Sequence, residues 1–259
     1  MTQDALASSK DGAASPALAR LLPGAGLVGF LPDLRLRQAP GAPSDLSFHR
    51  HGPLAHKAAR GCKIAFDWLA SAASLIVIAP VLCVIAALVK LDGGPVLFGH
   101  PRIGRDGQVF RCLKFRSMVT DSEAALSCLL RDDPLAAAEW AETFKLRRDP
   151  RITRIGRFLR ASSLDELPQL FNILRLEMSL VGPRPIVAAE VPRYGADIGA
   201  YHSIRPGLTG LWQISGRSLT TYDERVRLDI WYAGHWSFWS DIVIILKTVP
   251  AVLRSRGAC

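Results

Sequence analysis

The feature that most constrains this fold is a stretch without any charged residue, from Trp68 to Val89. Built as a helix that rises roughly 1.5 Å per residue, the stretch reaches about 33 Å, which is enough to cross a hydrocarbon layer of about 30 Å. A helix of this length without a polar face is unusual in the core of a soluble protein. The stretch therefore predicts a helix embedded in a membrane.

Two arrangements of this helix in a membrane are possible. The positive-inside rule favours neither orientation of a spanning helix, because basic residues flank both ends, and it is satisfied on both flanks if the segment enters and leaves by the same face. The flanking residues are Arg50, Lys57, Arg60 and Lys63 before the stretch, and Lys90, Arg102 and Arg105 after it. Pro80 removes a backbone hydrogen bond near the middle. We therefore expect a re-entrant hairpin broken at Pro80, with Ser71 or Ser74 satisfying a freed carbonyl, and a kinked spanning helix is the alternative.

The chain divides into three segments around this stretch. Residues 1–55 are rich in Ala, Ser, Gly and Pro and predict a mostly disordered or loosely held N-terminal arm. Residues 24–29 match the GxGxxG fingerprint, but no strand pattern precedes them, which argues against dinucleotide binding. Residues 56–92 form the hydrophobic re-entrant helix, and residues 93–259 form a folded domain that includes a C-terminal interfacial helix.

The folded domain has a mixed pattern, which predicts an α/β fold of mainly helical character. Residues 96–100 and 108–115 read as two strands joined by a loop that contains the turn pair Asp106-Gly107. Residues 121–130 and 135–145 read as helices. Aromatic residues crowd positions 231–239 and an apolar run follows at 242–246, which predicts an amphipathic helix with an interfacial aromatic belt or, alternatively, a buried core helix.

Charge and cysteine content limit the kind of partner. The net charge of +9 points to an anionic partner, which could be nucleic acid, anionic lipid or a phosphorylated substrate. The five cysteines include no CxxC pair and the six histidines no HExxH, so the sequence predicts neither a disulfide framework nor a zinc site. A reducing, cytosol-facing location fits this pattern. Four arginines recur every three residues and predict a basic stripe for lipid phosphate, diphosphate or nucleic acid, or a solvated face: Arg151, Arg154, Arg157 and Arg160.

Two adjacent carboxylates, Asp165 and Glu166, follow the arginine stripe. Ser163 and Glu166 fit a capping box, which is a purely structural role. Pro168 argues against that register, because it would delete a helical hydrogen bond, whereas with Asp165 as the cap Pro168 costs no bond. The pair is then expected at the mouth of a helix, where the dipole and the arginines would keep Asp165 ionised, as a carboxylate nucleophile requires.

Three further segments carry cations beside turns. Lys114 and Arg116 lie two residues apart and are expected on one side of a strand. Arg184 is held between two prolines in a Gly-Pro-Arg-Pro loop, and a glycine-rich loop runs from Arg205 to Arg217. Glycines allow close backbone approach to a ligand and arginines pair with phosphate, although tight turns with surface arginines would look similar.

Four motifs in order resemble the bacterial sugar transferase family, the polyprenyl-phosphate phosphoglycosyltransferases that prime glycan synthesis. They are KFRSM at 114–118, SLDELPQLFNIL at 163–174, MSLVGPRP at 178–185 and RPGLTGLWQISGR at 205–217. The resemblance covers about residues 60–255. With one hydrophobic segment before the catalytic domain, the chain is similar to the exopolysaccharide-priming members.

The resemblance implies a monotopic enzyme of the bacterial inner membrane whose active site faces the cytoplasm. It implies transfer of a sugar-1-phosphate, with galactose or glucose as the family-level sugar, from a UDP-sugar to undecaprenyl phosphate, with release of UMP and a requirement for Mg²⁺. Asp165 corresponds to the family's covalent nucleophile and is also the candidate metal ligand. Glu166 is its partner, as a positioning group, metal ligand or acid/base. The residues implied at substrate phosphates are Lys114, Arg116, Arg160, Arg184, Arg205 and Arg217.

The sequence departs from the family pattern at His100, where Gln is common, and at Leu176-Glu177, where Gly-Asp is usual. A different class of function is the alternative: a basic membrane-tethered scaffold or adaptor without catalysis, which would tolerate loss of both carboxylates. A homo-oligomer is possible, and the sequence does not specify it.

Overall fold

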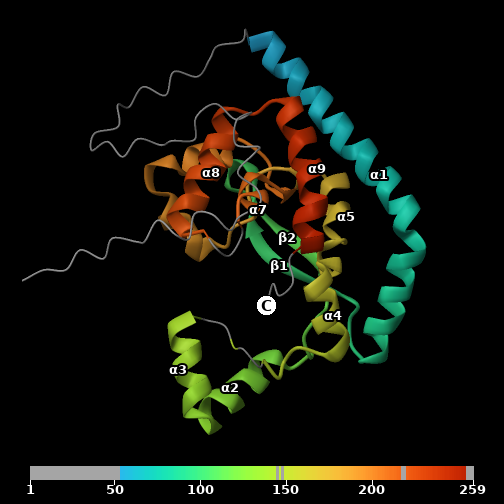
Figure 1. Ribbon diagram of the computed structural model, residues 1–259, viewed down its shortest axis with the longest axis vertical. Helices are drawn as coiled ribbons and strands as arrows, with labels where there is room; N and C mark the ends of the chain where they lie inside the picture. Colours follow the sequence, from blue (N-terminus) through green and yellow to red (C-terminus); the bar gives the residue numbers. More distant parts are fainter. Residues whose placement is uncertain (1–52, 144–145, 147–148, 217–219, 255–259) are drawn as a thin grey trace, which may run out of the picture. The chain divides into compact units, whose positions relative to one another are not determined.

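The structure, a computed structural model, describes residues 53–143, 146, 149–216 and 220–254 (Figure 1). The arm predicted at 1–55 lies almost entirely outside the described residues, as do the GxGxxG segment and Arg217. The helices are α1 (Pro53–Leu91), α2 (Ser122–Asp132), α3 (Pro134–Thr143), α4 (Arg154–Ser162), α5 (Gln169–Leu174), α6 (Ile198–His202), α7 (Leu211–Ile214), α8 (Tyr222–Gly234) and α9 (Phe238–Arg254). The strands are β1 (Leu97–Ile103), β2 (Val109–Phe115), β3 (Ser179–Val181) and β4 (Gly207–Thr209), and 3-10 helices span η3 (Arg105–Gly107), η4 (Leu164–Glu166) and η5 (Ala188–Asp197).

Helix α1 is long and apolar enough to cross a membrane by its length and composition. It continues through Pro80 as one helix, so the predicted break of the helix into a hairpin is wrong. Figure 1 shows that the helix curves along its length instead. Ser71 is fully buried, and its hydroxyl finds no hydrogen-bond partner among the described residues, so Ser71 does not satisfy a freed carbonyl as predicted.

One face of α1 packs against the rest of the domain. Ile85 and Val89 are buried in a cluster with Phe115 of β2 and Leu159 of α4. Earlier turns of α1 pack on a second cluster that β2 and α5 supply. The large apolar side chains of the other face stay exposed: Leu69, Ile76, Val77, Val81, Val84 and Leu88. The helix therefore lies along the domain and turns an apolar face away from it.

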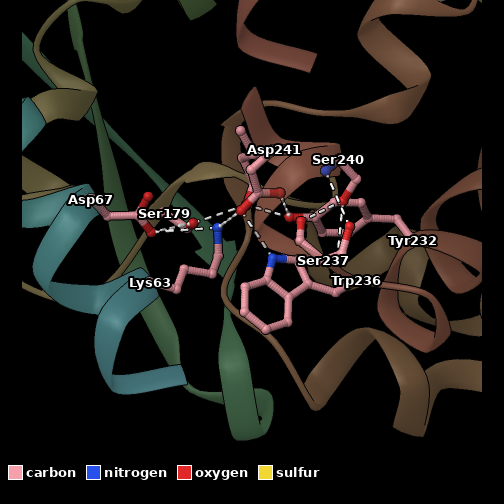
Figure 2. Close-up of polar contacts among 9 residues, drawn as sticks. Lys63, Asp67, Ser179, Tyr232, Trp236, Ser237, Ser240 and Asp241 are labelled. Carbon is pink, nitrogen blue, oxygen red and sulfur yellow. Dashed lines mark hydrogen bonds and ion pairs between the residues drawn. The ribbon is translucent and has the colours of Figure 1, made fainter. Parts of the chain in front are cut away.

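Polar contacts fix the N-terminal part of α1 to the domain (Figure 2). The Lys63 ammonium lies 2.5 Å from the Asp241 carboxylate of α9. One turn later, the Asp67 carboxylate accepts a hydrogen bond of 2.6 Å from the hydroxyl of Ser179 in β3. Asp241 also accepts hydrogen bonds from Tyr232 (2.6 Å) and from the Trp236 indole (2.9 Å).

The C-terminal end of α1 is fixed by Arg116. Its buried guanidinium donates to the carbonyl of Val89 (2.9 Å) and to that of Gly93. Lys114 and Arg116 were expected to share a side of one strand, but β2 ends at Phe115 and Arg116 turns toward α1. Both ends of the apolar helix are thus attached to the same domain.

Two small sheets complete the framework. β1 and β2 pair antiparallel through a turn that contains Asp106, which confirms the predicted hairpin. β3 and β4 pair in parallel. A Cβ atom added at Gly207 would lie 2.1 Å from the backbone nitrogen of Gly182, and one at Gly210 would lie 2.1 Å from the Gly182 carbonyl oxygen. Glycine at these positions lets the two loops pack closely against each other. The prediction was that these glycines would allow close approach of a ligand.

The helical segments outside the sheets follow the sequence pattern closely. α2 and α3 confirm the two helices predicted there and contact each other. α9 is amphipathic, because Ile244 is buried while Trp239 and Leu246 are 76% and 67% exposed, and the interfacial aromatic belt stays a prediction.

Candidate active site

Asp165 and Glu166 lie in the short turn between α4 and α5. Ser163 ends α4 in the left-handed conformation with φ 57°, and the 3-10 turn η4 then holds both carboxylates. Pro168 occupies the N-cap of α5, so the predicted register with Asp165 as the cap is wrong, although the pair does sit just before the helix. The N-cap residues of η4 and α5, Ser163 and Pro168, make no capping hydrogen bond with their side chains.

The close approach of α4 to the end of β2 sets the position of this turn. Thr153 caps α4 by accepting a hydrogen bond from the backbone N–H of Gly156. A Cβ atom at Gly156 would lie only 2.0 Å from the carbonyl oxygen of Ser117, so only glycine fits there. One turn further, the Arg160 guanidinium donates to the Ser117 hydroxyl at 2.9 Å.

Lys114 joins the two carboxylates from β2. Its ammonium lies 2.6 Å from Glu166 Oε1 and 3.9 Å from Asp165 Oδ2. Asp165 is 8% exposed, and burial raises the pKa of its carboxyl, an effect that Glu166 reinforces and that Lys114 and Arg160 oppose. Desolvation therefore outweighs the cations at this carboxyl, and its pKa is raised rather than lowered.

A cleft opens beside the carboxylates. Its lining combines the Lys114–Glu166 pair with Arg184, with Arg102 of β1 and with backbone of the glycine-rich loops: Arg102, Cys112, Lys114, Glu166, Gln169, Arg184, Pro185, Gly207, Leu208 and Gln213. The Arg184 guanidinium also lies over the Trp212 ring, 5.3 Å from its centroid. Three cations thus line one cleft with Glu166, and Asp165 lies beside it at 3.9 Å from the Lys114 ammonium, an arrangement suited to a diphosphate.

Arg102 was missed as a site residue. Its guanidinium donates to the Pro185 carbonyl at 3.2 Å, and burial together with the nearby Arg184 lowers its pKa. The hairpin register could have revealed it, because Arg102 pairs with Phe110 and so shares a face of the hairpin with Cys112 and Lys114.

The structure does not bring the other predicted residues into this cleft. Arg116 is bound to α1, and Arg205 lines a separate pocket with Arg105 and Glu177 while donating to the Leu176 carbonyl at 2.7 Å. Arg217 lies outside the described residues.

The arginine stripe is not one surface. Arg151 forms an ion pair with Asp149 at 2.7 Å, and Arg160 turns toward Ser117, while Arg154 and Arg157 are exposed on α4.

The donor set fits a magnesium ion that arrives with its substrate. Mg²⁺ is usually held by one or two carboxylates together with substrate phosphates and water. Asp165 and Glu166 supply two carboxylates that converge on one ammonium group. Across the described parts of the chain no cluster of three or more His, Cys, Asp or Glu residues could hold a metal by itself.

The chain was compared with known protein families and with individual proteins. The family described as "Bacterial sugar transferase" matches residues 58–255. The UDP-galactose-lipid carrier transferase of Erwinia amylovora is 51% identical over 79% of this chain and 43% of its own length. The exopolysaccharide production protein ExoY of Rhizobium meliloti is 51% identical over 76% of this chain and 87% of its own.

A relative with lower sequence identity is also named as a sugar transferase. The UDP-glucose:undecaprenyl-phosphate glucose-1-phosphate transferase of Caulobacter vibrioides is 39% identical over 82% of this chain and 78% of its own length. The chain spans less than half the length of the Erwinia protein, but the family match covers most of the chain. The chain therefore belongs to the bacterial sugar transferase family.

Proposed function

We propose that this protein transfers a sugar-1-phosphate from a UDP-sugar to undecaprenyl phosphate and releases UMP. The observation that carries the proposal is the buried Asp165 next to a cleft: Lys114 contacts Asp165 and Glu166, and Lys114 and Glu166 line the cleft together with Arg102 and Arg184. The relatives are named for a galactose or glucose transfer of this kind, and one for exopolysaccharide production. The reaction would be the priming step of exopolysaccharide synthesis.

The first half-reaction uses Asp165 as a nucleophile. Its carboxylate oxygen attacks the phosphorus that carries the sugar, the bond from that phosphorus to the bridging oxygen breaks, and UMP leaves with the bond electrons. A phosphosugar ester of Asp165 remains. The proton that Asp165 can carry because of burial must be lost first, and the Lys114 ammonium favours the ionised form.

In the second half-reaction, an oxygen of undecaprenyl phosphate attacks the same phosphorus. The aspartyl–phosphorus bond breaks, Asp165 recovers its carboxylate, and the lipid diphosphosugar forms. Glu166 holds the Lys114 ammonium at 2.6 Å and so fixes the cation next to the reacting carboxylate.

The cations divide between the two substrates. Arg184 and Arg102 line the cleft and are assigned to the nucleotide diphosphate, whereas Arg160 lies on α4, next to the exposed Arg157, and is assigned to the lipid phosphate. Mg²⁺, held by Asp165, Glu166 and substrate phosphate oxygens, would supply charge neutralisation of the diphosphate. Arg116, Arg205 and Arg217 are the weaker candidates for phosphate contact.

The membrane helix is proposed to enter and leave by one face of the bilayer. Lys63 near its start and Arg116 at its end attach α1 to one domain, which supports a monotopic arrangement over a spanning one. Its exposed apolar face, together with Trp239 and Leu246 of α9, would lie in the lipid of the bacterial inner membrane. The active site then faces the cytoplasm at headgroup depth, where both substrates can reach it.

A panel of UDP-sugars tests the function and identifies the sugar. Purified protein in detergent with Mg²⁺ and undecaprenyl phosphate should release UMP with one of them, and UDP-galactose and UDP-glucose are the first candidates. Asp165→Asn should abolish this release while the protein remains folded and membrane-bound. Absence of UMP with every sugar, or full turnover by Asp165→Asn, would instead favour a scaffold without catalysis.

A further inference from the structure

A second buried carboxylate lies behind the cleft. Asp229 of α8 is 2% exposed and accepts a hydrogen bond of 2.8 Å from the hydroxyl of Tyr194 in η5. The backbone N–H of Arg184 and its guanidinium also favour the charged form of this carboxylate and lower its pKa. One carboxylate therefore ties the Gly-Pro-Arg-Pro loop to α8 and to η5.

The same network reaches the side chain of Arg184. Arg225 lies one turn before Asp229 on α8, with 3.8 Å between its Nε and Asp229 Oδ2, and it is 3.3 Å from Glu190. Its guanidinium lies 5.2 Å from the centroid of the Trp212 ring, and the guanidinium of Arg184 lies 5.3 Å from that same centroid. Arg225 thus supports the ring that Arg184 contacts.

Stability of the fold does not by itself explain a buried ionic network of this kind. Burial raises the pKa of Asp229 to about 7, although Tyr194, Arg225 and Arg184 all favour its charged form. Well-packed apolar residues of similar volume are often as stabilising as a buried ionic network, or more so. The contacts of this network converge instead on the backbone and the side chain of one cleft arginine.

We propose that Asp229 is a positioning residue that holds Arg184 in place for the nucleotide diphosphate. It fixes the Arg184 backbone directly and the Arg184 side chain through Arg225 and Trp212. This role rests on the proposed function, because it assigns Arg184 to the UDP part of the substrate. The Gly-Pro-Arg-Pro loop positions both arginines of the cleft, because it carries Arg184 and because Arg102 donates a hydrogen bond to the carbonyl of Pro185.

The chain contains a matched control. Asp241 is also 2% exposed and also accepts a tyrosine hydroxyl, from Tyr232 at 2.6 Å, but its carboxylate joins α9 to α1, while the Tyr232 hydroxyl also contacts the Val181 carbonyl of β3 at 3.1 Å. If buried Tyr–Asp pairs only stabilised the fold, substitutions at Asp229 and at Asp241 would have the same effect on UDP binding. A positioning role affects ligand binding only at Asp229.

The test measures UDP binding by calorimetry at pH 8, together with the KM for UDP-sugar and for undecaprenyl phosphate. We expect Asp229→Ala to weaken UDP binding and raise the KM for UDP-sugar at least about tenfold, and to leave the KM for undecaprenyl phosphate unchanged. Asp229→Asn keeps an acceptor oxygen for the Arg184 N–H and should retain UDP binding within about threefold. Asp241→Ala should lower the unfolding midpoint without weakening UDP binding.

Wild-type UDP affinity in Asp229→Ala, or an equal loss in Asp241→Ala, would overturn the inference. If Asp229→Ala does not fold, Tyr194→Phe takes its place and should weaken UDP binding, with Asp241→Ala kept as the control. A wild-type protein that binds UDP with the predicted dependence on Asp229 but releases no UMP would contradict the proposed transfer while upholding the positioning of Arg184. Wild-type transfer with no effect of Asp229→Ala contradicts the positioning alone.

Discussion

At the scale of single residues, the pKa of Asp165 should govern the pH dependence of the proposed transfer. Burial raises this pKa, so the carboxyl stays protonated to a higher pH than an ordinary aspartate does. Because only the carboxylate attacks, kcat/KM for UDP-sugar should be constant above the raised pKa and fall about tenfold per pH unit below it. Initial rates of UMP release from pH 4 to 8 measure this, and an acid limb at or below the ordinary aspartate pKa would contradict it.

Leu176 has a strained backbone conformation. It adopts φ 60°, a left-handed conformation that costs a non-glycine residue about 1–2 kcal/mol, and it is 46% exposed.

Leu176→Gly should therefore stabilise the protein. Glycine removes the strain but adds about 0.5–1 kcal/mol of entropy to the unfolded chain, so the net gain should be at most about 1.5 kcal/mol. The midpoint of thermal unfolding in detergent measures the effect. A lower midpoint than in the wild type would show that the Leu176 side chain contributes packing that its exposure does not reveal.

The site residues could be predicted only in part. Ordered motifs identified Asp165, Glu166, Lys114 and Arg184 as candidates, and the structure brings them around one cleft or beside it. The pKa direction of Asp165 could not be predicted, because burial depends on how η4 packs. Arg116 was expected near phosphate because sequence spacing does not reveal that β2 ends one residue earlier.

At the scale of elements, the contact of α4 with the end of β2 places the carboxylate turn. Gly156→Ala puts a methyl group 2.0 Å from the Ser117 carbonyl oxygen, so α4 must move away and carry η4 with it. We expect a destabilisation of about 1–3 kcal/mol and a loss of transfer activity.

Gly61→Ala is the control for this substitution. Nothing lies within 4 Å of a Cβ atom at Gly61 in α1, so alanine should be neutral or slightly stabilising there. Unfolding midpoints and UMP release of both variants give the comparison. An active, stable Gly156→Ala would mean that α4 can shift without disturbing the turn.

Long periodic elements were predictable and short ones were not. The apolar run predicted α1, and the Asp106-Gly107 turn pair predicted the β1–β2 hairpin. β3 and β4 have three residues each, which is too short for a pattern, and tertiary pairing defines them. Pro80 predicted a broken helix, but the helix continues because packing along one face supports it on both sides of the proline.

At the scale of the whole molecule, the attachment of α1 predicts its topology. In a variant with Cys62 as its only cysteine, and in a second with only a new cysteine in place of Asp92, a membrane-impermeant thiol reagent should label both positions from the cytoplasmic side. Inverted vesicles and intact spheroplasts give the two sides. Labelling of the two positions from opposite sides would establish a spanning helix and contradict the monotopic arrangement.

A burst experiment detects the proposed covalent phosphosugar intermediate on Asp165. Protein mixed with the accepted UDP-sugar and Mg²⁺, without undecaprenyl phosphate, should release UMP in an amount that approaches the amount of enzyme and then stop. Mass spectrometry should find the added mass of a sugar phosphate on the peptide that contains Asp165, and Asp165→Asn should show neither signal. UMP that appears only after undecaprenyl phosphate is added, with no modified peptide, would contradict the account and indicate direct transfer between the two substrates.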